Sequence, residues 1–169
     1  MNTCDELKGK TLILTVGLPR SGKTTWARVQ GCPIVNPDSI RLALHGQRFV
    51  AKAEQFVWAI AYTMVEALFL AGHNKVIVDA TNVSRARRDE WVKRFDQKCT
   101  EEATPEQVAA CNHVEFHIVP TSVATCVRRA KSQNDEEIIP VIHRMAADWD
   151  LEQELDTEEA AIKRALGET

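Results

Sequence analysis

Residues 17–24, with the sequence GLPRSGKT, carry the clearest chemical signal in the chain. They fit the phosphate-binding pattern GxxxxGK[ST]. Residues 11–16 before the motif are typical of a buried strand, and residues 24–28 after it continue as a helix. Because backbone N–H groups at a helix start converge on an anion, the segment predicts a nucleoside triphosphate site rather than a chance match in a glycine-containing loop.

Each residue type in this motif has a task that suits a phosphate. Gly17 and Gly22 allow backbone conformations and a close approach that a Cβ would obstruct. The ammonium group of Lys23 is expected to reach the β- and γ-phosphates, and the Thr24 hydroxyl is expected to reach a Mg²⁺ ion. ATP and Mg²⁺ are therefore the predicted cofactors, and the residues expected to bind the nucleotide are Gly17, Ser21, Gly22, Lys23, Thr24 and Thr25.

A carboxylate follows the second predicted strand. Residues 33–36 predict this strand, and Asp38 comes just after it within VNPDSIR, residues 35–41. Asp38 is a candidate general base that accepts or orients the proton of an acceptor hydroxyl during in-line attack on the γ-phosphate. The alternative is that Asp38 or Ser39 caps the brief helix expected over residues 39–44.

Arg41 is a candidate ligand for a phosphate of the acceptor. It lies three residues after Asp38, so the two side chains share one face of a helix. A guanidinium group at that position could hold a phosphate through two hydrogen bonds. The alternative is an ordinary solvated charge on the helix.

A second carboxylate, Asp79, ends the strand predicted over residues 75–78. A hydrophobic strand that delivers an acid to its carboxyl end is typical of a magnesium shell, so Thr24 and Asp79 form the predicted metal site. The alternative for Asp79 is a cap or a turn. The polar turn and helix that follow supply four further candidates for substrate binding, of which the two arginines could line one groove: Thr81, Asn82, Arg85 and Arg88.

Two arginines end the helix predicted over residues 121–131. Small kinases carry a mobile lid at such a place, with a cation for the transferring phosphate, and residues 128–140 are the predicted lid. Arg128 and Arg129 are the candidates for that cation, with Arg144 as the next choice. The alternative is that they stabilise the negative end of their own helix.

The order of the predicted elements indicates an α/β fold of the P-loop NTPase class. Strands alternate with helices, which implies right-handed crossovers and a central parallel sheet covered by helices on both faces, with a helical lid. Such sheets bind ligands at the carboxyl ends of their strands, where the candidate residues fall. The longest helix is predicted over residues 51–71, ended by Gly72, with a core-facing stripe made of Ala53, Phe56, Val57, Ile60, Met64, Leu68 and Ala71.

Composition narrows the class of protein further. A chain of 169 residues suits a single domain, and a net charge of −3 provides no general attraction to nucleic acid. Five cysteines without a CxxC pair fit free thiols in a reducing compartment. The N-terminus has no apolar h-region, so a soluble, cytoplasmic protein is expected, without a membrane or an obligate protein partner. Residues 100–112 predict a surface excursion and residues 151–169 a surface helix.

Three blocks of sequence resemble the polynucleotide kinase family of P-loop phosphotransferases, typified by the kinase domain of the T-even phage end-healing enzyme. The blocks are ILTVGLPRSGKTTWAR at 13–28, VNPDSIR at 35–41 and VIVDATN at 76–82, the last followed by Arg87, Arg88 and Trp91. The resemblance implies that Lys23 and Thr24 hold ATP and Mg²⁺, Asp38 is the general base, and Arg41 engages the acceptor phosphate. It also places Asp79 near the metal and the acceptor.

The chain departs from the family pattern in three places. Residues 132–135, with the sequence SQND, stand where the family's lid typically carries an arginine, for which Arg129 could substitute. Residues 100–112 look inserted, and no phosphatase domain follows the kinase module.

The first choice of function is therefore an ATP-dependent kinase of a nucleic-acid hydroxyl, with the 5′-hydroxyl end preferred and DNA favoured over RNA. The close alternative is a kinase of the hydroxymethyl group of 5-hydroxymethyluracil in phage DNA, which requires the base to be flipped out. A nucleoside or other small-molecule kinase and a non-kinase NTP switch remain open. Stand-alone modules of this kind include both phage DNA kinases and small-molecule kinases.

Overall fold

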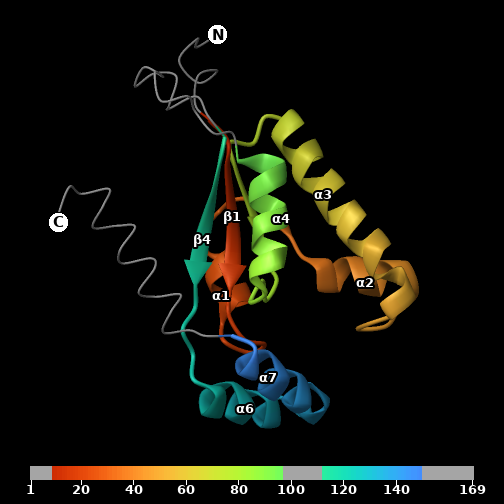
Figure 1. Ribbon diagram of the computed structural model, residues 1–169, viewed down its shortest axis with the longest axis vertical. Coiled ribbons are helices and arrows are strands. Elements are labelled where there is room, and N and C mark those ends of the chain that lie inside the picture. Colours follow the sequence, from red (N-terminus) through yellow and green to blue (C-terminus); the bar gives the residue numbers. More distant parts are fainter. Residues whose placement is uncertain (1–8, 97–111, 150–169) are drawn as a thin grey trace, which may run out of the picture. The chain divides into compact units, whose positions relative to one another are not determined.

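Four parallel strands form the centre of the fold. The computed structural model describes residues 9–96 and 112–149 (Figure 1). Along the sheet the strands follow the order β2-β3-β1-β4, and their bounds are Thr11–Val16 for β1, Ile34–Val35 for β2, Lys75–Val78 for β3 and His113–Ile118 for β4. All three pairings are parallel, so the carboxyl ends of the strands lie on one edge. The predicted P-loop α/β class is confirmed.

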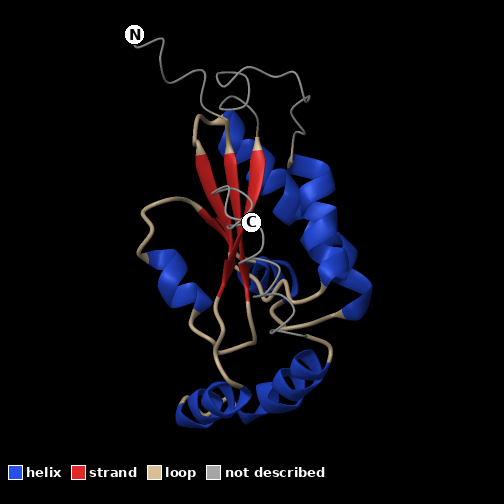
Figure 2. Cartoon of the chain, turned by 60° about the vertical axis from the view of Figure 1, so that its left-hand side comes forward, coloured by secondary structure: helices blue, strands red, loops and turns tan. Residues whose placement is uncertain are grey.

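Strand β1 is buried along its whole length because it pairs on both sides and is covered on both faces. Leu12 and Leu14 face one core cluster, together with residues of β2 and β3. Ile13 points to the opposite face and packs with Ile77 and with Ala27. Ala27 lies on helix α1, Lys23–Arg28, which therefore covers that second face (Figure 2).

Two helices cover the first face, α3 over Glu54–Leu70 and α4 over Arg85–Phe95 (Figures 1 and 2). Between them lies Trp91 of α4, which is fully buried and meets the Tyr62 ring at a centroid distance of 4.3 Å. A short helix, α2 over Pro37–His45, packs against α3. It is longer than the predicted 39–44 and begins at a proline, which has no N–H for a preceding residue to satisfy.

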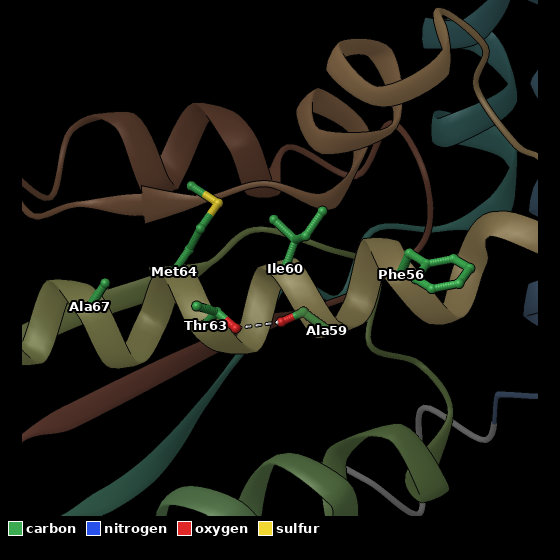
Figure 3. A pocket seen from close by; sticks show the side chains of 6 residues that line it. All are labelled: Phe56, Ala59, Ile60, Thr63, Met64 and Ala67. Atoms are coloured by element: carbon green, nitrogen blue, oxygen red, sulfur yellow. Dashed lines mark hydrogen bonds between the residues drawn. The ribbon is translucent and has the colours of Figure 1, made fainter.

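Helix α3 presents to the sheet only part of the face that its sequence predicts. Its buried residues are Val57, Ala61, Tyr62, Val65 and Phe69. Of the predicted stripe Val57 is buried, whereas Phe56 and Met64 are exposed. Figure 3 shows both on the outer side of α3, in a shallow apolar groove with Ile60 and Ala67. The prediction was wrong for Phe56 and Met64, whereas Ile60 and Leu68 pack against the core cluster as predicted. This helix is apolar nearly all round, so periodicity alone does not select one face.

A short 3₁₀ helix, η1 over Ala51–Ala53, precedes α3 directly. Together they form the segment Ala51–Leu70, which by length and composition alone is long and apolar enough to cross a membrane. Val57, Ala61 and Val65 of this segment pack in the sheet core, as the residues of a core helix do. The end of α3 follows prediction, since Gly72 takes a left-handed φ of 95° and its N–H donates to Phe69 O.

The chain divides into two compact units. The sheet and helices α1 to α4 belong to the first, which takes in Gly22–Val119 and the residues up to Gly17. The second joins Leu18–Ser21 to the chain from Pro120 onward. The described helices of this unit are α6 over Val123–Ser132, the 3₁₀ helix η2 over Glu136–Ile138 and α7 over Ile139–Ala147.

The helix predicted over residues 121–131 is present in this second unit as α6. Ser122 caps α6 by accepting a hydrogen bond from Thr125 N, and Pro140 lies in the first turn of α7. The predicted excursion at 100–112 lies outside the described residues except for Asn112, and the predicted helix at 151–169 lies outside them entirely. A single functional domain over 1–169 stays a prediction.

The stacked pair of Trp26 and His117 generates a prediction for stability against pH. The ring of Trp26 on α1 lies 3.5 Å from that of His117 on β4, centroid to centroid, at an interplanar angle of 11°. Burial lowers the pKa of His117 below its ordinary 6.5. The folded state therefore favours neutral His117, and its stabilisation is complete above pH 6.5 and declines as the pH falls through that value.

Replacement of His117 by phenylalanine should keep the stacked ring and remove part of the decline in melting temperature between pH 7 and pH 5. His73→Asn, a change at an exposed histidine, is the matched control and should leave the decline intact. Identical pH profiles for wild type and His117→Phe would contradict the assignment.

Candidate active site

The phosphate-binding loop leaves the carboxyl end of β1 and enters α1. Gly17 and Gly22 have φ values of 153° and 113°, in the region that side-chain-bearing residues rarely adopt. Gly17 N donates to Thr81 O at 2.9 Å, which ties the loop's start to the turn after β3. Lys23 is the first residue of α1 and is buried, whereas Thr24 is exposed. The two glycines thus allow the backbone turn that leads from β1 into the N-terminus of α1.

The middle of the loop, Leu18–Ser21, belongs to the second unit and is held by α6 and the turn after it. Arg129 Nη1 donates to Ser21 O at 2.6 Å and to Arg20 O at 3.1 Å. Thr121 Oγ1 donates to Ser21 O at 2.9 Å. Of the two predicted lid cations, Arg129 thus contacts the phosphate loop, and Arg128 is an exposed residue of the same helix.

An amide that the sequence analysis missed organises the ends of β2 and β3. Asn36 Nδ2 lies 3.1 Å from both the backbone oxygen and Oδ2 of Asp79, and donates to each. Asn36 Oδ1 accepts from Ser39 N at 2.8 Å and thereby caps α2. The alternative role of Asp38 or Ser39 as the cap is therefore wrong, because Asn36 fills it. The signal was present, since asparagine before proline is a typical helix start.

Asp38 is left with its side chain 80% exposed and next to Arg41. Arg41 Nη1 lies 2.6 Å from Asp38 Oδ1. The other side of the same guanidinium meets Glu54 of α3 in a fork, with Nε 2.7 Å from Oε1 and Nη2 2.7 Å from Oε2. The sequence places Asp38 and Arg41 together as predicted, but gave no sign of Glu54, which lies thirteen positions further on.

The pKa values of this pair follow from its geometry. The Arg41 guanidinium lowers the pKa of Glu54 below its ordinary value, mainly through their hydrogen bonds. Hydrogen bonding to Glu54 likewise raises the pKa of Arg41. Arg41 is therefore a fixed cation whose charge is balanced by two carboxylates.

The turn after β3 and the helix α4 that follows it place Asn82, Arg85 and Arg88 differently from one another. Asn82 is buried, with Nδ2 donating to Thr15 O at 2.9 Å, and its Oδ1 has no hydrogen-bond partner among the described residues. Buried Arg88 donates to Asn82 O and Val83 O at 2.8 and 2.9 Å. Arg85 is 87% exposed. The two arginines do not line one groove, because Arg88 folds back onto its own turn.

Among the described residues no cluster of three or more histidine, cysteine or acidic side chains could hold a metal. Buried Asp79 and the exposed hydroxyl of Thr24 offer single oxygen donors. That donor set fits Mg²⁺, which keeps most of its waters and binds proteins through one or two side chains together with substrate phosphates.

A family model described as "AAA domain" matches residues 12–152. Of solved structures, one titled as a Pnkp1/Rnl/Hen1 complex is 26% identical, with a TM-score of 0.56 over 72% of this chain and 39% of that one. A second, titled as the Pnkp1/Rnl/Hen1 RNA repair complex, is 21% identical, with a TM-score of 0.57 over 85% of this chain and 47% of that one. The chain therefore spans less than half the length of either.

A gluconokinase from Sinorhizobium meliloti 1021 is 17% identical, with a TM-score of 0.48 over 83% of this chain and 75% of that one. This similarity is too low to support an argument. No curated protein matches the chain significantly.

The fork between Arg41 and Glu54 generates a prediction for stability. Glu54→Gln removes the charge that Arg41 is hydrogen-bonded to, at a cost of about 1–3 kcal/mol in the free energy of unfolding at pH 7. Because the pKa of Glu54 is lowered, this contribution is complete above its ordinary 4.5 and is lost as the pH falls through the lower, folded-state value.

Urea unfolding of wild type and variant between pH 3 and pH 7 measures the difference. Glu66→Gln, on the exposed part of the same helix, is the matched control and should cost little. A Glu54→Gln difference that is equally large at pH 3 would show that the charge is not its cause.

Proposed function

The chain belongs to the AAA domain family, whose model spans most of it, and we propose that it transfers the γ-phosphate of ATP to a hydroxyl of a nucleic acid. An ATP-dependent phosphotransferase is the class of enzyme that the phosphate-binding loop and the family match support. The preferred acceptor is a 5′-hydroxyl end of DNA, with RNA as the second choice. We propose further that the protein is soluble and cytoplasmic.

The observation that carries the proposal is the release of Asp38 from capping. Asn36 satisfies the N-terminus of α2, so that the carboxylate of Asp38 projects one turn from Arg41. A base beside a phosphate-binding cation suits an acceptor that bears a phosphate near its reactive hydroxyl. The end of a polynucleotide has that chemistry, and a free nucleoside lacks it.

The reaction needs one proton acceptor and several charge-stabilising groups. Asp38 accepts the hydroxyl proton as the acceptor oxygen forms a bond to the γ-phosphorus and the bond to the leaving ADP oxygen breaks. Lys23 balances the charge that builds on the phosphate oxygens. Thr24 and Asp79 would hold Mg²⁺, which when bound would supply further positive charge there. Arg41 holds the neighbouring phosphate of the acceptor, and Thr81 and Asn82 lie in the turn beside the loop.

A panel of acceptors with radiolabelled ATP tests this function. It comprises 5′-hydroxyl DNA and RNA oligonucleotides, 5-hydroxymethyluracil DNA with blocked ends, and free nucleosides. Transfer to 5′-hydroxyl ends is expected. Transfer only to the modified base selects the alternative DNA kinase, transfer only to nucleosides a small-molecule kinase, and ATP hydrolysis without any transfer an NTP switch; each of these outcomes overturns the proposal.

Asp38→Asn should keep nucleotide binding and reduce transfer by roughly 10²–10⁴-fold, the range typical of a lost acid or base. The fold should be unaffected, because Asn36 and not Asp38 caps α2. Asp89→Asn, a change at an exposed acid of α4, serves as the control and should retain wild-type kcat. Full activity of Asp38→Asn would remove this residue from the mechanism.

Arg41→Ala should raise the acceptor KM about tenfold or more for a nucleotide bearing a 3′-phosphate, and little for the corresponding nucleoside, because only the first offers the guanidinium a phosphate. The double change Arg41→Ala with Glu54→Gln removes the unpaired carboxylate and controls for its burial. Equal effects on both acceptors would favour a small-molecule kinase.

A further inference from the structure

We propose that Arg20 is a positioning residue of the phosphate-binding loop, held in place by Asp135 and Gln133 in the turn that follows α6. This inference rests on the proposed phosphoryl transfer. All of its contacts lie within the second unit, since residues 18–21 and the chain from 120 onward belong together.

The backbone of Arg20 is the first observation. Its φ is 65°, in the left-handed region that residues with a Cβ enter only at an energetic cost. It is the one arginine with a positive φ in the described part of the chain. Such a conformation persists only where surrounding contacts hold it, and here it lies three residues before Lys23 in a loop built for phosphate.

The side chain of Arg20 is fixed by two contacts. Nη2 forms an ion pair with Asp135 Oδ2, and Nη1 donates to Gln133 Oε1. Asp135 is only 7% exposed, so its carboxylate is costly to bury without a cation. The Arg20 guanidinium is its ion-pair partner in the described structure, and the two charges are therefore expected to be strongly coupled.

The local sequence explains the conformation of the turn that carries Gln133 and Asp135. Helix α6 ends with Asn134 in a left-handed conformation, φ 52°. Asn134 N donates to Lys131 O at 3.1 Å and Asp135 N to Ala130 O at 3.0 Å, which is the pattern of a Schellman motif. Asparagine tolerates this conformation better than most residues, and the motif brings Gln133 and Asp135 to Arg20.

The same loop is held a second time through its carbonyl groups. Arg129 Nη1 donates to the oxygens of Arg20 and Ser21, and Thr121 Oγ1 donates to that of Ser21. The segment after α6 lacks an arginine of its own, as the sequence SQND shows. The cation, Arg20, lies on the phosphate-binding loop, and the segment after α6 supplies the carboxylate of Asp135. The pair thus fixes the backbone of residues 18–21 within the second unit.

The experiment compares Arg20→Gly, Arg20→Lys, Asp135→Asn and the double variant Arg20→Gly with Asp135→Asn. Glycine adopts a φ of 65° without strain, so Arg20→Gly removes the pair while favouring the loop's backbone. Glu137→Gln, at an exposed acid of the same segment, is the matched control. Readouts are kcat, the KM for ATP and the melting temperature.

Arg20→Gly and Asp135→Asn should each reduce kcat roughly tenfold, with the KM for ATP changed less than about twofold, since positioning acts on the transition state. The double variant should be no slower than either single one, and Arg20→Lys should recover part of the loss. A drop in melting temperature with unchanged kcat would assign the pair a structural role only and overturn the proposal. Multiplying losses in the double variant would equally overturn it.

Acceptor-free hydrolysis of ATP gives the same comparison without any assumption about the acceptor. If the variants lose hydrolysis while no nucleic acid is phosphorylated, the pair is upheld and the proposed acceptor is wrong. If wild type phosphorylates 5′-hydroxyl ends and all variants match it in both assays, the acceptor is right and the pair has no positioning role.

Discussion

The parallel pairing of β1 with a strand on each side is the constraint on which the first unit depends. Backbone groups buried at both edges of β1 must be satisfied, and the pairings with β4 over Thr11–Val16 and with β3 over Thr11–Leu14 satisfy most of them. One consequence is that the chain leaves β1 and β3 at the same edge, where Gly17 N bonds to Thr81 O. The phosphate loop and the turn carrying Asn82 are thus neighbours by hydrogen bonding as well as by topology.

At β2, the next strand of the sheet, the side chain of Asn36 connects the segments that follow the strands at this edge. Asn36 bridges the helix that follows β2 and the aspartate that follows β3, so one amide sets both Asp79 and the start of α2. The bridge frees Asp38 from a structural task. Its carboxylate is mostly solvated, so its attraction to Arg41 is weak, whereas the less exposed fork to Glu54 holds the guanidinium in place. Under the proposed function, Arg41 exchanges Asp38 for a phosphate of the acceptor while Glu54 keeps the guanidinium in position.

Features that depend on local sequence could be predicted, and features that depend on distant contacts could not. The loop at 17–24, strands β1 and β3 and the glycine end of α3 follow from motifs, β-branched runs and turn residues. The outward side of α3 could not be predicted, because an all-round apolar helix takes its orientation from the surface it packs on. Asn36 competes with three neighbouring residues that also favour turns and caps, and only the hydrogen bond from Ser39 N in the folded chain identifies it as the cap.

The two arginine pairs show the same limit and one common physical device. Arg41 meets Glu54 across a helix junction, and Arg20 meets Asp135 across more than a hundred residues, so neither partner is visible in a local pattern. Each carboxylate removes freedom from a long cationic side chain before any ligand arrives, which lowers the entropy lost on binding. The disadvantage is that the charge of each arginine is already neutralised by its carboxylate partner, which weakens its attraction for an anionic ligand. In a chain with a net charge of −3, attraction of a polyanion must then come from pre-positioned local groups and not from the overall field, and it should be correspondingly less sensitive to salt than binding through unpaired surface cations.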